Sequence, residues 1–186
     1  MSRRDKMPGM SFEPFRIEVP DDEIADLRSR IRATRWPDEL PDAGWSYGTD
    51  LGLLRQVARY WADEYDWRAH EAALNELPPF VTTVQGQRVH FVHVRSPHED
   101  ALPLVLTHGW PGSFIEFTKA IGPLVDPTAH GGDAADAFHV VVPSLPGYGF
   151  SGPTTEPGWD VRRIAGAWAE LMAALGYTRY GAQGGD

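Results

Sequence analysis

The 186-residue sequence contains no cysteine, which rules out disulfides, thiolate metal sites and a cysteine nucleophile. A disulfide-stapled secreted fold is therefore disfavoured. The sequence also lacks any run approaching the roughly 20 apolar residues that a membrane-spanning helix needs. Basic residues are outnumbered, with 17 Lys and Arg against 26 Asp and Glu. The resulting net charge of −9 argues against electrostatic binding to nucleic acid or to an anionic membrane.

The N-terminal segment 1–15 carries basic side chains, but no apolar run follows them, so the pattern of a signal peptide is missing. We therefore expect a cytoplasmic protein. The composition, 42% hydrophobic and 23% charged, is ordinary for a globular domain. The length suits one domain with an appended arm.

The chain changes character near residue 79. Before that point, apolar residues recur at helical spacing, and we expect three helices within 20–36, 51–65 and 66–77. Asp21 and Asp22 are suited to the N-cap and first turn of the first helix, and Asp66 to the cap of the third. We assign 1–79 to a helical N-terminal segment and 80–186 to an α/β domain.

After residue 79 the hydrophobic periods shorten and strands alternate with helices. The expected strands lie in 80–84, 88–94, 104–107, 138–142 and 178–186, and the expected helices in 114–125 and 159–176. A hairpin at Gln85-Gly86-Gln87 is expected between the first two strands. The alternation predicts right-handed crossovers and a mostly parallel sheet. In such sheets the chemistry gathers at the carboxyl ends of the strands.

The first strand end with a chemical signal reads His108-Gly109-Trp110-Pro111. A glycine lets the backbone turn sharply and bring an N–H group close to a reacting oxygen. This is the requirement for one half of an oxyanion hole. A plain β-turn into a helix is the alternative, and Pro111 favours the oxyanion turn because it fixes the backbone there.

Two further strand ends are rich in glycine. Gly147, Gly149 and Gly152 form a G-x-G-x-x-G pattern, but Pro153 and more loop follow the third glycine instead of a helix, so we interpret the pattern as a structural loop. Gly184-Gly185-Asp186 has the small residues of a nucleophile elbow, with aspartate in place of the usual serine. A surface turn is the alternative for so short a motif.

The segments HGWPGS at 108–113, PSLPGYGFS at 143–151 and GAQGGD at 181–186 resemble the α/β-hydrolase fold of epoxide hydrolases. The N-terminal part, with TRWPDE at 34–39 and GWSYGTD at 44–50, resembles the N-terminal domain of the microsomal and juvenile-hormone type. The resemblance covers nearly the whole chain. The membrane anchor of the microsomal enzymes is missing from it, so a soluble relative is expected.

The resemblance implies an enzyme that opens an epoxide to a vicinal diol through a covalent aspartyl ester. By position, Asp186 is the nucleophile, and the backbone N–H of Trp110 is one oxyanion donor. No cofactor or metal is implied. The family's acidic residue, catalytic histidine and two cap tyrosines lie downstream of the nucleophile, so we expect a core truncated at the elbow that is active only with a C-terminal half. The epoxide and the oligomeric state, a homo-oligomer included, stay open.

Two other functions remain open. A haloalkane dehalogenase shares the aspartate nucleophile, but such enzymes generally begin near the first strands and lack the helical N-terminal segment. A non-catalytic truncated paralogue or interaction module would keep the scaffold without the machinery. A serine esterase is disfavoured because Asp186 occupies the elbow.

The histidines offer no metal site. His90 and His93 are an odd number of residues apart on a strand and so face opposite sides. His108 precedes the nucleophile at the oxyanion turn, and we expect it to be packed and hydrogen-bonded instead of acting as the general base. His130 lies in a polar loop and is expected to be exposed. Tyr148 is expected at most to line a pocket.

Overall fold

The structure is a computed structural model, and it describes residues 10–185. The described chain divides into two compact units, one formed by 17–74 and the other by 10–16 together with 75–185. The predicted nucleophile Asp186 lies outside the described residues.

The 17–74 unit consists of helices, as the sequence pattern predicts. They are α1 (Asp21–Arg32), α2 (Leu51–Asp63) and α3 (Trp67–Glu76), whose last two residues belong to the other unit. Asp66 accepts a hydrogen bond from Ala69 N at 3.1 Å and caps α3 as predicted. For α1 the N-cap is Pro20, and both Asp21 and Asp22 lie in the first turn. There their negative charges interact favourably with the positive end of the helix dipole.

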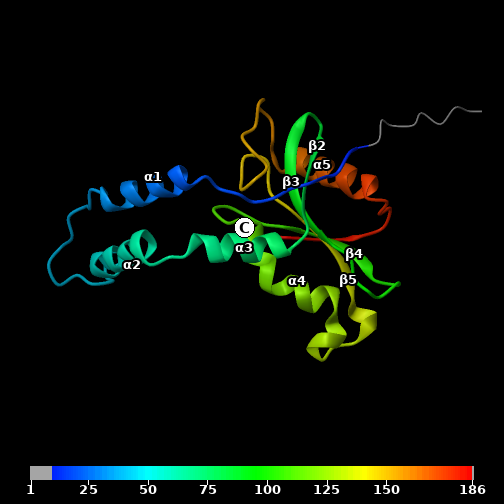
Figure 1. Cartoon of the computed structure of the whole chain (residues 1–186), viewed down its shortest axis with the longest axis horizontal. Coiled ribbons are helices and arrows are strands. Elements are labelled where there is room, and N and C mark those ends of the chain that lie inside the picture. The colour runs from blue at the N-terminus through cyan, green and yellow to red at the C-terminus, as the bar shows by residue number, and fades with distance from the viewer. Residues whose placement is uncertain (1–9, 186) are drawn as a thin grey trace, which may run out of the picture. The chain divides into compact units, whose positions relative to one another are not determined.

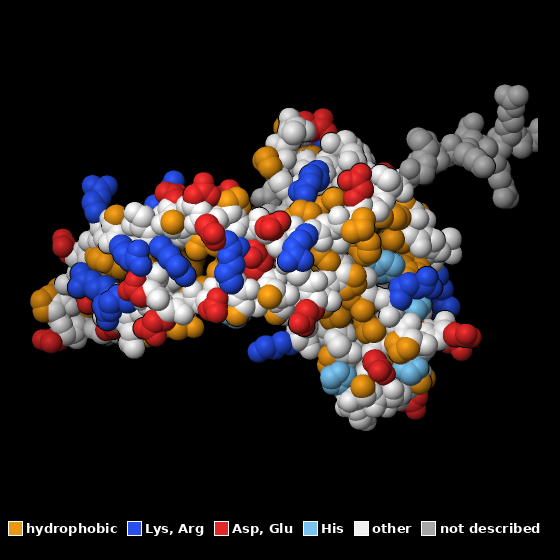
Figure 2. Space-filling view, in the orientation of Figure 1, with side chains coloured by type: hydrophobic (Ala, Val, Ile, Leu, Met, Phe, Trp, Pro, Cys, Tyr) orange, Lys and Arg blue, Asp and Glu red, His pale blue; other side chains and the backbone are white. Residues whose placement is uncertain are grey.

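A buried carboxylate holds the start of this unit to α3. Glu71 accepts hydrogen bonds from Val19 N at 2.7 Å and from Arg68 Nη1 at 2.6 Å. The backbone hydrogen bond from Val19 is the main reason that the pKa of Glu71 is lowered. Arg68 also pairs with Asp21. Over the surface of α1 and α2, acidic and basic side chains are interspersed (Figure 2).

The other unit is built on one six-stranded sheet with the order β1-β2-β3-β5-β4-β6 (Figure 1). The strands are β1 (Glu13–Pro14), β2 (Pro79–Val84), β3 (Gln87–Val94), β4 (Leu102–Thr107), β5 (Phe138–Pro143) and β6 (Gly181–Gly184). The described residues of this unit also form five helical segments after β4: η1 (Phe114–Phe117), α4 (Thr118–Val125), η2 (Pro127–His130), η3 (Ala134–Asp136) and α5 (Val161–Ala174).

The sheet is mixed in the described residues, whereas the sequence predicts a mostly parallel one. Only β4–β5 and β4–β6 pair in parallel, while β1–β2, β2–β3 and β3–β5 are antiparallel. Strands alternate with helices only after β4, because no helix separates β3 from β4. The direction in which each strand pairs depends on partners distant in the chain, so the alternation pattern does not reveal the antiparallel pairs. The β2–β3 hairpin is confirmed. Gln85 (φ 50°) and Gly86 (φ 79°) both have a left-handed backbone, as a two-residue type I′ turn requires.

The main core lies between α5 and one face of the sheet. Buried side chains from α5, including Trp168 and Leu171, pack against strand residues such as Phe91 and Val141. The opposite face carries His90 of β3 against Phe114 of η1. Helix α5 lies within the predicted range 159–176: Asp160 accepts a hydrogen bond from Arg163 N at 2.9 Å before its first turn, and Gly176 follows its end with φ 89°.

Within the described residues, no helix is long and apolar enough to cross a membrane. Residues 10–185 also hold no cluster of His, Asp and Glu side chains that could bind a metal ion. The segment 36–50 between α1 and α2 contains no helix or strand, and its last residue, Asp50, caps α2 by accepting a hydrogen bond from Leu53 N at 2.7 Å.

Candidate active site

Two of the three predicted strand ends lie side by side. Strands β4 and β6 pair in parallel with Thr107 opposite Gly184, so their carboxyl ends reach the same edge of the sheet. The His108–Pro111 turn follows β4 at this edge, and Gly185 follows β6. A Cβ on Gly184 would lie in ordinary van der Waals contact with Thr107 Cβ, at 3.6 Å, so the two strand ends are packed against each other. The oxyanion turn and the residues that precede Asp186 are therefore neighbours in space.

Two cavities, of about 620 Å³ and about 380 Å³, open at this edge. They share five lining residues: Thr107, Gly109, Trp110, Gln183 and Gly185. The larger one extends along an apolar wall of α5 that includes Ile164 and Trp168. The smaller one extends over the turn to Glu116 and Phe117. The polar side chains of Thr107 in β4 and Gln183 in β6 thus belong to residues that line both cavities.

Trp110, the predicted oxyanion donor, lines both cavities. Its residue is 72% exposed, and its peptide bond to Pro111 is cis. Trp110 is therefore not a core residue but part of the cavity lining. This placement is consistent with a role for the backbone N–H in binding a ligand oxygen.

His108 is packed and hydrogen-bonded, as the sequence predicts. It is only 2% exposed, and its Nε2 accepts a hydrogen bond from Leu145 N at 3.1 Å. Its Nδ1 lies 3.2 Å from Gly109 O, so the neutral ring carries its proton on Nδ1 and donates it to that carbonyl. His108 therefore joins the oxyanion turn to the loop that follows β5.

The glycine-rich loop after β5 is a structural loop, because no helix begins until Val161. A buried polar network holds it: Ser151 Oγ donates to Ser144 O at 2.7 Å and accepts from His90 N at 3.0 Å. His90 Nδ1 lies 2.9 Å from Ser144 Oγ. Burial, and to a smaller extent the charge of Arg88, lowers the pKa of His90 to about 4. The imidazole is thus neutral at pH 7.

The other histidines do not join the site. His93 faces the opposite side of the sheet from His90, where its Nε2 lies 2.9 Å from Tyr177 Oη. Burial lowers its pKa to about 4 as well. His130 is exposed, as predicted. Tyr148 contacts His108 edge-on but lines neither cavity at the strand ends.

Sequence reasoning missed the polar side chains of the smaller cavity, Glu116 and Gln183. Gln183 was visible only as part of the final strand. Glu116 had a usable signal, because Ser113-Phe114-Ile115-Glu116 has the S-x-x-E spacing of a capping box at a helix start.

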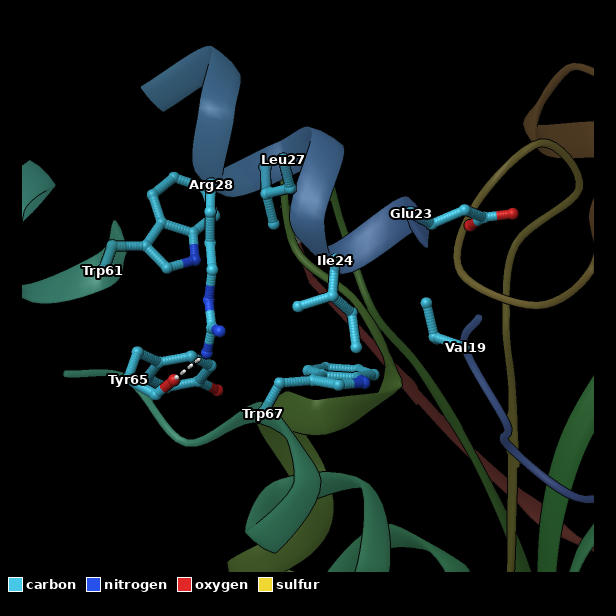
Figure 3. A pocket seen from close by; sticks show the side chains of 8 residues that line it. All are labelled: Val19, Glu23, Ile24, Leu27, Arg28, Trp61, Tyr65 and Trp67. Carbon is cyan, nitrogen blue, oxygen red and sulfur yellow. Dashed lines mark hydrogen bonds between the residues drawn. The ribbon is translucent and has the colours of Figure 1, made fainter. Parts of the chain in front are cut away.

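The helical unit has a separate cavity of about 320 Å³, drawn in Figure 3. Its wall is mainly apolar, with Ile24, Leu27, Trp61 and Trp67 among the lining residues. Arg28 crosses it and donates from Nη2 to Tyr65 O at 3.4 Å, beside Trp61 (Figure 3). It contains no nucleophile next to an oxyanion donor, so it does not compete with the strand-end site as a place for chemistry.

Two family models match the chain. Residues 103–186 match the model described as alpha/beta hydrolase fold, so the class of protein that this sheet and its strand-end turn define is the α/β-hydrolase, as the sequence predicts. Residues 12–117, more than half of the chain, match the model described as epoxide hydrolase N terminus. The chain therefore belongs to this epoxide hydrolase family, which confirms the predicted resemblance.

Several similar proteins are named as epoxide hydrolases. The chain is 56% identical to a protein of Stigmatella aurantiaca (strain DW4/3-1) named "Putative epoxide hydrolase", over 93% of this chain and 39% of the relative. It is 39% identical to epoxide hydrolase 1 of Sus scrofa, over 95% of this chain and 40% of the relative. The crystal structure of juvenile hormone epoxide hydrolase from the silkworm Bombyx mori is similar with a TM-score of 0.84 and 36% identity, over 95% of this chain and 42% of that chain. The chain thus spans about two fifths of the length of these relatives.

Proposed function

We propose that this chain is the N-terminal part of an epoxide hydrolase that converts an epoxide to a vicinal diol through an aspartyl-ester intermediate. The observation that carries the proposal is the parallel pairing of β4 with β6, which brings the Trp110 turn beside Gly184 and Gly185. The match of residues 12–117 to the epoxide hydrolase N terminus favours an epoxide over a haloalkane as substrate.

In the first half-reaction, a carboxylate oxygen of Asp186 attacks an epoxide carbon. A bond forms between that oxygen and the carbon, and the epoxide C–O bond breaks. The leaving oxygen is an alkoxide and needs a proton, which the two tyrosines implied by the family resemblance would donate from the remainder of the full-length protein. The product is an ester of Asp186 with one hydroxyl beside it.

In the second half-reaction, the histidine implied by the family resemblance, in the remainder of the full-length protein, would take a proton from water as the water oxygen attacks the acyl carbon of the ester. The tetrahedral intermediate carries its negative charge on the former carbonyl oxygen, to which the backbone N–H of Trp110 donates a hydrogen bond. Such donors typically contribute a factor of about 10² to 10³ in rate. Collapse of the intermediate breaks the acyl C–O bond and frees Asp186 as a carboxylate, and the leaving diol oxygen takes the proton that the histidine removed from water, which releases the diol. A serine nucleophile would form an ether, which has no acyl carbon for water to attack.

The test uses the full-length protein and an epoxide in ¹⁸O-labelled water under single-turnover conditions. Because water attacks the acyl carbon, the label is expected in the side chain of Asp186 and not in the first equivalent of diol. Peptide mass spectrometry measures the label in Asp186, and mass analysis of the diol measures the label in the product. Label that enters the diol directly would exclude Asp186 as nucleophile.

The same preparation separates the alternatives. Halide release from a haloalkane without diol formation from an epoxide would indicate a dehalogenase. A full-length protein that forms no ester with either substrate would indicate a non-catalytic protein. Asp186→Asn, which removes the nucleophilic oxygen but keeps the size of the side chain, should abolish ester formation and serves as the control.

A further inference from the structure

The segment between the oxyanion turn and η1 forms a helix start that lies directly beside the candidate active site. Ser113 is the N-cap of η1, and its Oγ accepts a hydrogen bond from Ile115 N at 3.4 Å. Glu116 N donates to Ser113 O at 3.1 Å. In a capping box, the glutamate at this spacing folds its side chain back toward the N-cap.

The Glu116 side chain does fold back, and it reaches Gly112. A Cβ on residue 112 would lie 1.4 Å from Glu116 Oε1 and 2.6 Å from its Cδ. The carboxylate thus occupies the space that any side chain at position 112 would need. Gly112 does not have a left-handed backbone, so a side chain at position 112 would meet the carboxyl group of Glu116, which would have to move aside.

Glu116 also lines the smaller cavity at the strand ends, together with Trp110, Gln183 and Gly185. Among the described lining residues of that cavity it is the only one with an ionisable side chain. Gly112, against which the carboxylate lies, is two residues from Trp110. A contact at Gly112 therefore acts on the same short turn that carries the Trp110 N–H.

We propose that Glu116 is a positioning residue for the oxyanion turn: its carboxyl group, seated over Gly112, holds the backbone of 110–113 so that the Trp110 N–H keeps the orientation that ester hydrolysis needs. This inference rests on the proposed function. Glu116 acts through the turn and does not touch the reacting atoms. Because the proposed contact is with the space over Gly112, the shape of the side chain matters and its charge does not.

The proposal predicts a difference between the two half-reactions. The oxyanion exists only while the ester is hydrolysed, so a displaced Trp110 N–H slows ester decay and leaves ester formation unchanged. A misplacement of about 1 Å can cost roughly 10²-fold in rate. We therefore expect a fall of about 10- to 100-fold in the rate constant of ester decay, and an ester that accumulates under single turnover.

The experiment follows ester formation and decay in the full-length protein by rapid quench and mass spectrometry of the peptide with Asp186. Glu116→Ala should slow decay by the factor given above, and Glu116→Gln should retain the wild-type rate constant within about threefold, since glutamine keeps the shape of the side chain that lies over Gly112. Gly112→Ala, which drives the carboxyl group away, should slow decay as Glu116→Ala does. The double variant should show no further loss, because both changes remove one contact.

The matched control is Asp136→Ala, which removes an exposed carboxylate of η3 that lines neither cavity, and it should leave both rate constants unchanged. Equal slowing of formation and decay in Glu116→Ala, or no slowing of decay, would overturn the proposal. If Glu116→Ala does not fold, Glu116→Asp takes its place, because its shorter side chain withdraws from Gly112: decay slower than in Glu116→Gln supports the proposal, and decay that is not slower overturns it.

The failure of this inference can be told from failure of the proposed function. If the wild-type protein forms no ester at Asp186, the proposed function fails. If the wild-type protein forms and hydrolyses the ester while the Glu116 and Gly112 variants do so equally fast, the proposed function stands and the role of Glu116 is wrong.

Discussion

At the residue scale, the turn after β4 is held from two sides. His108 accepts a hydrogen bond from Leu145 N and contacts Gly109 O, which ties the start of the turn to the loop after β5. Glu116 lies over Gly112 at the end of the turn. Trp110 is between these two anchors and is largely exposed. Trp110, which lines both cavities, thus lies between two residues that contact other parts of the chain.

The His108 anchor leads to a prediction about stability. His108→Phe keeps an aromatic ring but leaves the Leu145 N–H without its acceptor. The free energy of unfolding should fall by about 1 to 3 kcal/mol, the usual cost of a buried donor that loses its partner. Denaturant titration of the full-length protein measures this change.

The matched control for His108 is another histidine of the same unit. His130 is exposed, so His130→Phe should change the free energy of unfolding by no more than about 0.5 kcal/mol. A loss in His108→Phe no larger than that in the control would show that the Leu145 hydrogen bond does not stabilise the turn.

At the element scale, α5 covers one face of the sheet and its two ends are well defined. Asp160 caps its start, and Gly176 follows its last turn in the left-handed region. Gly176 N donates to Ala173 O at 3.0 Å and Tyr177 N donates to Met172 O at 2.9 Å, which is the Schellman arrangement. These bonds direct the chain from α5 toward β6, and hence toward the strand end that precedes Asp186.

Two glycines of this region should respond in opposite directions to alanine. Gly176→Ala forces a Cβ into a left-handed backbone and should lower the free energy of unfolding by about 1 to 2 kcal/mol. Gly166→Ala, within α5, should raise it by about 0.5 to 1 kcal/mol, because alanine favours the helix and a Cβ there would lie 3.8 Å from its nearest neighbour, Gln85 Nε2.

Thermal and denaturant unfolding of the two full-length variants compare these values. A loss of stability in Gly166→Ala, or its absence in Gly176→Ala, would contradict the helix boundaries described above. The two variants can be compared directly because each adds one methyl group, at Gly166 within α5 and at Gly176 just after it.

At the scale of the whole molecule, buried histidines make stability depend on pH. His90 is 0% exposed, and its pKa in the folded state is about 4, against an ordinary value of 6.5. The unfolded chain therefore binds a proton below about pH 6.5 that the folded chain takes up only near pH 4. The stabilising effect of neutral His90 is fully present above pH 6.5 and is lost as the pH falls from 6.5 to about 4.

The size of this effect can be measured. From pH 7 to pH 4 the His90 contribution should lower the free energy of unfolding by about 3 kcal/mol, since one pKa unit corresponds to about 1.4 kcal/mol. In His90→Phe the decline over the same range should be smaller by about that amount. His93 titrates in the same window and stays unchanged in both proteins, so it serves as the internal reference. An equal decline in both proteins would show that His90 titrates normally.

Much of the fold was predictable from the sequence because its signals are local. Helical spacing, the cap Asp66 and the turn at Gln85-Gly86 each depend on residues within a few positions, and the structure confirms them. The resemblance of 108–113 and 181–186 to the epoxide hydrolases was likewise carried by short motifs, and the family match confirms it. The domain boundary at 79 and the roles of Asp186 and Trp110 stay predictions.

What the sequence by itself determined is therefore the family, the order of its elements and the residue types at each strand end. Only the tertiary structure decided that β4 lies beside β6, that β3 runs antiparallel to β5, that His90 is buried among aromatic rings and that Glu116 rests on Gly112. The physical reason is distance along the chain. Helices, caps and turns are set by near neighbours, whereas strand order, burial and close side-chain approach depend on segments that meet only when the chain folds.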